Sequence, residues 1–353
     1  MIPAGRHSGV PDPPGAERAA AGSGTTRPGA PGRPDVNPAS GLTREAIERI
    51  VALSGLARPL SDPARQSAFT FVEDAGRKYK VLAYPSAAAA RERFALLERT
   101  GDLFSPCPGR VENCLVHEYV EGSGGEGGLR LAEDIGGFLA DLGRIDSEGM
   151  NEQEFDDWAR TLEENGMFLA VTAAALRRYC ADALTRPVRW DLEYLDAVPK
   201  NFVYGGRRNL TCIDSKHLHP GPQGVSLAKL HANIGEYCRR EDYEAIRRVY
   251  QDRVPDNRLD DPAYFGFCLL YYSLFFLVAN ARRFPLRLNA GNGMNRTRRK
   301  IVLGIIEASP WICVLESLRW EWAFARAWMS NLPGRAVRFT LRHTGGGRAK
   351  NSG

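Results

Sequence analysis

The chain has 353 residues, of which 43% are hydrophobic, so it is long enough to bury one two-lobed core or two smaller ones. Its formal net charge of +5 is mildly basic, and we expect no nucleic-acid partner on this basis. The seven cysteines form no CxxC pair or metal-ligand spacing and no signal peptide is evident, which predicts reduced thiols in a cytoplasmic protein.

The two ends of the chain differ in composition from the rest. Residues 1–40 are rich in Pro, Gly, Ala and Arg, and such a segment cannot bury enough surface to offset its ordering entropy. We expect 1–40 to be disordered and the polar tail 342–353 to be loose. Between them we expect a small lobe over 41–121 and a larger lobe over 122–341.

The small lobe opens with a predicted β-hairpin. Residues 69–72 and 78–84 have the pattern of paired strands across the turn 73–76. A helix is predicted over 87–99, because Ser86 is a suitable N-cap and a glycine follows the last periodic residue. No glycine-rich phosphate loop precedes the hairpin.

A further strand and more helices follow. The segment CLVHEYVEGSG, residues 114–124, is an apolar strand that ends in a polar run with glycine. Apolar residues at helical spacing over 152–184 predict a helical insert that ends before Pro187.

Three polar residues near the middle of the chain, Asp196, Asn201 and Asp214, are spaced as a phosphoryl-transfer site requires. Two apolar runs within 202–213, separated by a Gly-rich turn, predict a hairpin that brings Asn201 and Asp214 together. An amide and a carboxylate oxygen there would hold Mg²⁺ together with phosphate oxygens, and Asp196 would accept a proton from a substrate hydroxyl. A plainer interpretation also exists, because a polar residue beside a hairpin is more often a turn former than a ligand.

In order and spacing, residues 55–230 resemble the aminoglycoside phosphotransferase and choline kinase-like family. The resemblance is carried first by the Asp-Asn-Asp set and second by Glu118, Tyr119, Val120 and Gly122, which match the Glu-Tyr-x-x-Gly of that family's hinge. It implies an α+β, two-lobed protein kinase-like fold with a small antiparallel β lobe and a mostly helical large lobe. It also implies that Glu118, Tyr119 and Val120 lend backbone groups to adenine, and that residues 135–146 are the helix that follows the hinge.

The family also pairs a strand lysine with a helix glutamate to hold nucleotide phosphates. Glu92 matches the glutamate, but Leu82 stands at the place of the lysine and Lys80 lies two residues earlier. Side chains two apart on a strand share a face, so Lys80 would serve from a shifted position. The alternative, that Lys80 is a solvated edge residue and the site has no lysine, remains open at this point.

The motif departs from the family pattern at two places. Tyr194 stands where the family has His, and Asp214 is followed by Ser215 instead of an apolar residue. These differences change the support of Asp196 and Asp214 while leaving both carboxylates in place.

The large lobe continues as helices. Residues 265–280 are strongly apolar but shorter than the ~20 residues that a bilayer crossing needs, so a buried helix is predicted and no membrane span is expected. The segment 241–261 is rich in Asp and Glu, including Asp256, Asp260 and Asp261. It suggests a positively charged acceptor, although an acidic face neutralised by neighbouring arginines explains it as well.

Together these features predict transfer of the γ-phosphoryl group of ATP or GTP to a hydroxyl of a small molecule such as an amino sugar or amine alcohol. Asp196 is the expected base, Asn201 and Asp214 the expected Mg²⁺ ligands, and Lys80 with Glu92 the expected phosphate clamp. Two other hypotheses are a catalytically impaired pseudokinase that binds nucleotide or protein, favoured by the missing phosphate loop, and a helical binding protein without the kinase fold. The sequence does not set the oligomeric state.

Overall fold

The structure is a computed structural model that describes residues 35–56, 68–124, 128–205 and 209–330. The predicted tail 342–353 and residues 1–34 of the predicted disordered segment lie outside the described residues. Residues 35–40 correct the expected boundary of that segment. Asp35–Val36 forms strand β1 and Pro38–Ser40 forms a short 3-10 helix.

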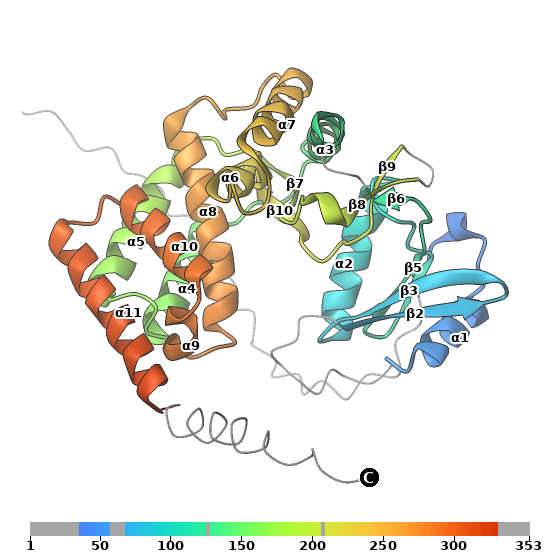
Figure 1. Cartoon of the computed structure of the whole chain (residues 1–353), viewed down its shortest axis with the longest axis horizontal. Coiled ribbons are helices and arrows are strands. Elements are labelled where there is room, and N and C mark those ends of the chain that lie inside the picture. The colour runs from blue at the N-terminus through green and yellow to red at the C-terminus, as the bar shows by residue number, and fades with distance from the viewer. Residues whose placement is uncertain (1–34, 57–67, 125–127, 206–208, 331–353) are drawn as a thin grey trace, which may run out of the picture. The chain divides into compact units, whose positions relative to one another are not determined.

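The small lobe is built on an antiparallel sheet with strand order β1-β4-β5-β3-β2 (Figure 1). The predicted hairpin is confirmed as β2 and β3, joined by Ala75 and Gly76 with φ of 50° and 74°. A two-residue turn with both φ values positive matches the twist of the flanking strands. The remaining strands of this sheet are β2 (Ala68–Asp74), β3 (Arg77–Ala83), β4 (Gly109–Val111) and β5 (Cys114–Glu118).

The two faces of this sheet have different neighbours. Helix α1 (Arg44–Ser54) covers one face, where Ile47 and Ile50 pack on Val81 and Val116. Phe71 lies opposite Lys80 in the register, so both point to the other face, as does Phe69 two residues away. Helix α2 (Ala87–Arg99) follows β3 as predicted, and the hydroxyl of its N-cap Ser86 accepts the N–H of Ala89 at 3.1 Å.

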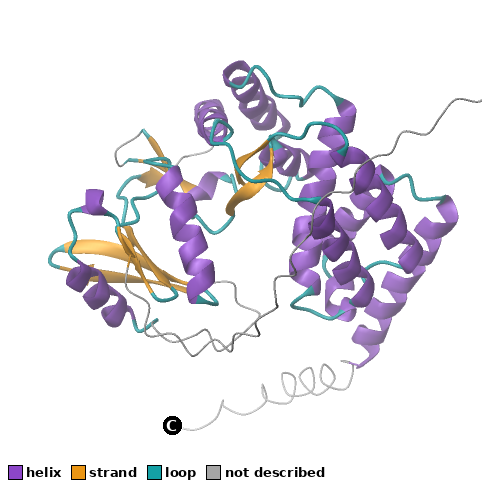
Figure 2. Cartoon of the chain, turned by 180° about the vertical axis from the view of Figure 1, so that it is seen from behind, coloured by secondary structure: helices purple, strands orange, loops and turns teal. Residues whose placement is uncertain are grey.

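The large lobe is mainly helical (Figure 2). The predicted insert is two helices, because Gly166 with φ of 70° interrupts the chain between them. The helix expected at 135–146 begins earlier and ends earlier than predicted, at Leu129 and Leu142. The helices are α3 (Leu129–Leu142), α4 (Glu152–Glu164), α5 (Ala170–Leu184), α6 (Val225–Ala232), α7 (Arg240–Arg253), α8 (Pro262–Ala281), α9 (Leu286–Ala290), α10 (Gly293–Ile305) and α11 (Pro310–Ser330).

Two small sheets carry the middle of the chain. Strand β7 (Trp190–Tyr194) pairs with β10 (Leu218–Pro222). Strand β8 (Phe202–Tyr204) pairs with β9 (Leu210–Cys212), which confirms the second predicted hairpin, and also with β6 (Ser123–Gly124) just after β5.

The segment 103–106 connects the first and third sheets through the backbone. The N–H of Ser105 donates to Cys212 O at 2.9 Å, and the N–H of Cys212 donates to Leu103 O at 3.1 Å. At the other end, the N–H of Glu118 donates to Pro106 O at 2.8 Å. The β8–β9 hairpin is therefore hydrogen-bonded to the small lobe at two places, through β6 and through 103–106.

Helix α8 lies in the core of the large lobe, against α4, α6 and α10. It is the one helix among the described residues that is long and apolar enough to span a membrane, and 56% of its most apolar window is buried within the protein. All seven cysteines are free thiols.

Candidate active site

Asp196 lies in the loop between β7 and β8, and Asn201 holds its carboxylate. The Nδ2 of Asn201 donates to Asp196 Oδ2 at 2.7 Å, to Asp196 O at 2.8 Å and to the Tyr194 hydroxyl at 3.1 Å. Tyr194, which stands where the family has His, is fully buried beneath this loop. The loop is thus fixed by the side chain that it presents as a candidate ligand.

Lys229 of α6 contacts the other oxygen of the same carboxylate. Its Nζ lies 3.2 Å from Asp196 Oδ1 and also donates to Leu195 O. Burial opposes ionisation of Asp196, but Lys229, His217 and the Asn201 amide outweigh it, so the pKa of Asp196 lies below its usual value. The carboxylate is therefore ionised and ready to accept a hydrogen bond near neutral pH.

Asp214 follows β9, and the hairpin brings it to Asn201. The N–H of Ile213 donates to Asn201 O at 2.9 Å, so the two candidate metal ligands lie on adjoining backbones. Asp214 Oδ1 accepts the N–H of Lys216, and its Oδ2 lies 3.3 Å from Lys216 Nζ. The side chain of Asp214 keeps 19% of its exposure, so one edge of it remains open to a ligand.

Lys80 reaches from the small lobe to this point. Its Nζ donates to Ile213 O at 2.9 Å, and Leu82, on the same strand face, is buried in the core. Burial lowers the pKa of Lys80, and the nearby charge of Asp214 opposes that shift. Lys80 is therefore not a solvated edge residue: its ammonium binds the backbone next to Asp214, within electrostatic range of that carboxylate.

The expected ion pair between Lys80 and Glu92 is not formed in the described part of the chain. Glu92 is exposed on α2, and its neighbour Arg93 faces inward. The Nε and Nη1 of Arg93 are buried without a hydrogen-bond partner, in the electrostatic neighbourhood of Tyr84 and Asp214. Successive helical residues differ by about 100° in direction, so a one-residue difference in phase turns the cation inward in place of the carboxylate.

The hinge residues lie at the end of β5. The N–H of Tyr119 donates to Lys78 O at 3.0 Å, so it is occupied. The N–H of Val120 has no backbone partner among the described residues and is therefore free to donate to a ligand. Glu118 is half-buried and Tyr119 is 41% exposed.

Two aromatic side chains near the hinge were not identified from the sequence. Phe69 and Phe71 are 52% and 47% exposed, on the face of β2 that carries Lys80 across the register. The ring of Phe69 lies 5.3 Å from Lys80 Nζ and 5.6 Å from Lys216 Nζ, and Phe71 packs edge-on against Tyr119. Their spacing of two residues on a strand opposite Lys80 was the available signal.

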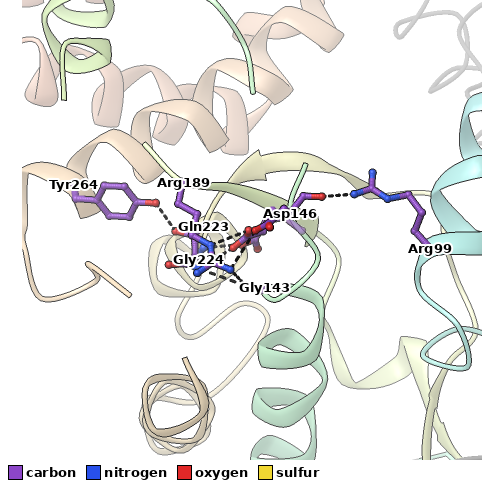
Figure 3. Close-up of polar contacts among 9 residues, drawn as sticks. Arg99, Gly143, Asp146, Arg189, Gln223, Gly224 and Tyr264 are labelled. Carbon is purple, nitrogen blue, oxygen red and sulfur yellow. Dashed lines mark hydrogen bonds and ion pairs between the residues drawn. The ribbon is translucent and has the colours of Figure 1, made fainter. Parts of the chain in front are cut away.

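Two carboxylates of strand β7 are buried and make polar contacts with residues that include Arg189, Gln223 and Gly224, which are labelled in Figure 3. Asp191 accepts from Gln223 Nε2 at 2.7 Å and from Arg189 Nε at 3.1 Å. Two residues later, Glu193 accepts the N–H of Gly224 at 2.6 Å, and burial raises the pKa of Glu193 to about 8. These contacts define the direction in which the chain leaves β7 toward Asp196.

The donor set fits a magnesium ion bound together with a nucleotide. The Nδ2 of Asn201 is engaged by Asp196, and no described residue donates to its Oδ1. That amide oxygen and the Asp214 carboxylate offer two hard oxygen atoms of the kind that Mg²⁺ prefers, and a bound Mg²⁺ would fill its other positions with phosphate oxygens and water. Within the described ranges, no group of three His, Cys, Asp or Glu side chains is placed to hold a metal without such a nucleotide.

Comparison with known proteins reveals similarity at the level of structure. No family model and no curated protein matches the sequence. Among solved structures, a candidate fructosamine-3-kinase from Thermobifida fusca aligns with a TM-score of 0.52 and 16% identity, covering 74% of this chain and 98% of that one. The choline kinase LicA from Streptococcus pneumoniae aligns with a TM-score of 0.50 and 15% identity, covering 74% of this chain and 97% of that one.

Identity this low establishes the fold alone. The chain has the two-lobed, α+β kinase-like fold that the resemblance implied. The hypothesis of a helical binding protein without that fold is wrong, because the five-stranded antiparallel sheet and the helical lobe are both present.

Proposed function

We propose that the protein is a small-molecule kinase that transfers the γ-phosphoryl group of ATP, or of GTP, to a hydroxyl of a small acceptor in the cytoplasm. The observation that carries this proposal is the position of Asp196, Asn201 and Asp214, which the β8–β9 hairpin and the Asn201 amide draw together. Solved structures that share this fold include a choline kinase and a candidate fructosamine-3-kinase, which supports transfer of a phosphoryl group to a small molecule. The neighbours do not identify the acceptor.

Asp196 is the proposed base. Its Oδ2 is held by Asn201 and its Oδ1 by Lys229, so the carboxylate has a defined orientation toward a hydroxyl. As the hydroxyl oxygen forms its bond to the γ-phosphorus, the bond from that phosphorus to the bridging oxygen breaks and leaves ADP. Asp196 accepts the hydroxyl proton in this displacement.

Asn201 and Asp214 are the proposed ligands of Mg²⁺, which, when bound, neutralises charge on the phosphates. We expect Lys80 and the half-buried Lys216 to contribute positive charge to the same phosphates. Lys216 forms an ion pair with Asp214, and Lys80 is within electrostatic range of it. The adenine or guanine ring of the nucleotide is proposed to contact the ring faces of Phe69 and Phe71 and the N–H of Val120. Glu92 is not included in this set, because it is exposed.

The test is an Asp196→Asn variant, which keeps the shape of the side chain and removes its basicity. We expect turnover to fall by about 10²- to 10⁴-fold, the range for loss of a general base. Nucleotide binding should change little, because Asp196 contacts Asn201 and Lys229 and not the small-lobe face. The readout is ADP release in a screen over amino sugars, amine alcohols and nucleosides, with a Mg-ATP thermal shift as the binding assay.

Asp157→Asn is the matched control, since Asp157 is an exposed carboxylate on α4 whose side-chain partners are Arg160 and Gln153. Full activity in the Asp196→Asn variant would show that another group is the base. Binding of Mg-ATP to the wild-type protein without turnover of any acceptor would favour the pseudokinase hypothesis.

A further inference from the structure

A buried guanidinium on α10 has no counter-ion among the residues that the structure describes. Arg298 is 7% exposed, and its Nε and Nη1 donate to the neutral partners Tyr272 Oη at 3.2 Å and Asn295 Oδ1 at 3.1 Å. No carboxylate of the described residues lies within ion-pair distance of it. A buried charge without a counter-charge is costly, so the protein keeps this one against a stability penalty.

The ring of Phe276 connects Arg298 to the candidate base. The guanidinium lies 4.4 Å from the centre of this ring, and Lys229 Nζ lies 5.6 Å from the same centre. Lys229 is 4% exposed and pairs with Asp196. Two buried cations thus share one aromatic ring at the position where the acceptor hydroxyl must arrive.

The charges at this position do not balance. Asp196 is the only carboxylate that contacts Lys229 in the described residues, and it must take up a proton during the proposed reaction. At that moment neither Lys229 nor Arg298 would have an anionic partner. The exposed Lys200 adds a further positive charge within the electrostatic range of Lys229.

The acidic segment, in contrast, lies at the far end of α8. Asp261 caps the first turn of α8 and pairs with Arg258, and Asp260 pairs with Arg247 at 2.6 Å. Phe276 is fifteen residues further along the helix, which corresponds to about 22 Å along its axis. These carboxylates are neutralised by arginines and do not face Asp196, so they give no support to a cationic acceptor.

Resting on the function proposed above, we propose that the acceptor is a small hydroxylated anion, with a carboxylate or phosphate group that is bound by Arg298 and Lys229 beside Asp196. The anion supplies the missing counter-charge and orients the hydroxyl toward the base. Its two possible groups share the same chemistry, a compact oxyanion that a guanidinium binds with two hydrogen bonds.

The first test compares matched probes on the full-length protein. Gluconate, sorbitol and N-methylglucamine have six-carbon polyol chains with negative, no and positive charge, and glycerate, glycerol and glycerol 3-phosphate form a three-carbon set that separates carboxylate from phosphate. Melting temperature is measured against probe concentration at constant ionic strength. We expect a saturable rise with at least one anion and none with the neutral or cationic probes. A rise of equal size with all charges, or no saturable rise with any anion, would overturn the proposal.

The second test uses variants of neighbouring arginines. Arg298→Met keeps the length of the side chain and removes its charge, and we expect it to fold, because it replaces an unpaired buried cation. Arg299→Met is the matched control: Arg299 is 4% exposed on the same helix but lies over Trp320, on the other side. The Kd of the best anion should rise at least tenfold in Arg298→Met and less than twofold in Arg299→Met. An unchanged Kd in folded Arg298→Met contradicts the proposal.

ADP release with the same probes distinguishes this proposal from the function on which it rests. Turnover of sorbitol or N-methylglucamine without turnover of any anion would leave the kinase function in place and overturn the anionic acceptor. Binding of an anion that depends on Arg298, without ADP release from any probe, would retain the anion site and argue against the kinase function.

Discussion

At Lys80, one hydrogen bond decides a question that the sequence left open. The sequence established that Lys80 and Leu82 share a strand face, but the register with β2 and β5 was needed to show which of the two lies in the core. The orientation of Glu92 could not be predicted, because α2 carries charged residues at 91, 92 and 93 and its rotation is set by packing. Lys229 was missed for the same reason, since its contact with Asp196 comes from the tertiary fold.

We predict that Lys80→Met raises the Kd of Mg-ATP about tenfold or more, equivalent to at least about 1.4 kcal/mol. Methionine preserves the apolar stem. It removes the ammonium that binds Ile213 O and is within electrostatic range of Asp214. Lys78→Met is the matched control: it lies on the same strand and face, but its Nζ is 4.2 Å from the Tyr119 ring and makes no contact with Asp214. Fluorescence titration with a labelled nucleotide measures both. Equal losses in the two variants would show that only general charge is involved.

Elements with strong local signals were predicted well from the sequence. The hairpins at 68–83 and 202–212 and the helix at 87–99 follow turn and capping rules that act within a few residues. The pairing of β6 with β8 was not predicted, because each is a strand of two or three residues without a periodic pattern. The start of α5 was also not predictable from local sequence, because its capping side chain comes from a distant part of the chain.

Helix α5 begins without a capping side chain of its own. Its N-cap is Leu169, and the missing acceptor comes from Glu316 of α11, whose Oε1 accepts the N–H of Leu169 at 2.7 Å and the Thr172 hydroxyl at 2.6 Å. Glu316 is fully buried, so a carboxylate here also interacts favourably with the dipole of α5. The contact joins the end of the large lobe to its insert.

We predict that Glu316→Leu lowers the free energy of unfolding by about 2–4 kcal/mol, because it leaves the buried hydroxyl of Thr172 and the part-buried N–H of Leu169 without an acceptor. Glu321→Leu on the same helix should change it by less than about 1 kcal/mol, since Glu321 is an exposed partner of Arg296. Urea unfolding followed by circular dichroism measures both variants. A Glu316→Leu variant as stable as the wild type would show that α5 does not depend on this cap.

For the whole molecule, the sequence predicted the kinase-like fold and the two lobes but not the electrostatic character of the interior. Two histidines lie far from each other in the sequence and are both buried. His117 is on β5, and His219 on β10 stacks on Phe275 at 4.4 Å. Burial lowers the pKa of His117 to about 4 and that of His219 to about 3, so both are neutral in the folded protein.

We predict that this burial makes the protein sensitive to mild acid. An unfolded histidine has a pKa of about 6.5, so below that pH the unfolded chain binds more protons and each buried histidine removes about 1.4 kcal/mol of stability per pH unit. The stabilising contribution is present above pH 6.5 and is lost as the pH falls toward 4.

His219→Phe tests this, because the ring stacking is preserved and the titration is removed. Both proteins should lose free energy of unfolding when the pH is lowered from 7 to 5. The loss should be smaller in the variant than in the wild type by about 2 kcal/mol. Urea unfolding at both pH values gives the comparison. Parallel losses in the two proteins would mean that His219 does not contribute to the acid response.

The backbone contacts of 103–106 have a consequence for product exchange. They attach the β8–β9 hairpin, with Asp214 at its end, to the strand that forms the hinge. Val120, the proposed contact of the adenine ring, and Asp214, the proposed metal ligand at the phosphates, would then move as one unit. A hinge opening of the two lobes at Val120 would not separate these two residues. The product nucleotide would then dissociate past the exposed rings of Phe69 and Phe71. The phosphorylated acceptor would stay bound to the helical lobe during this step.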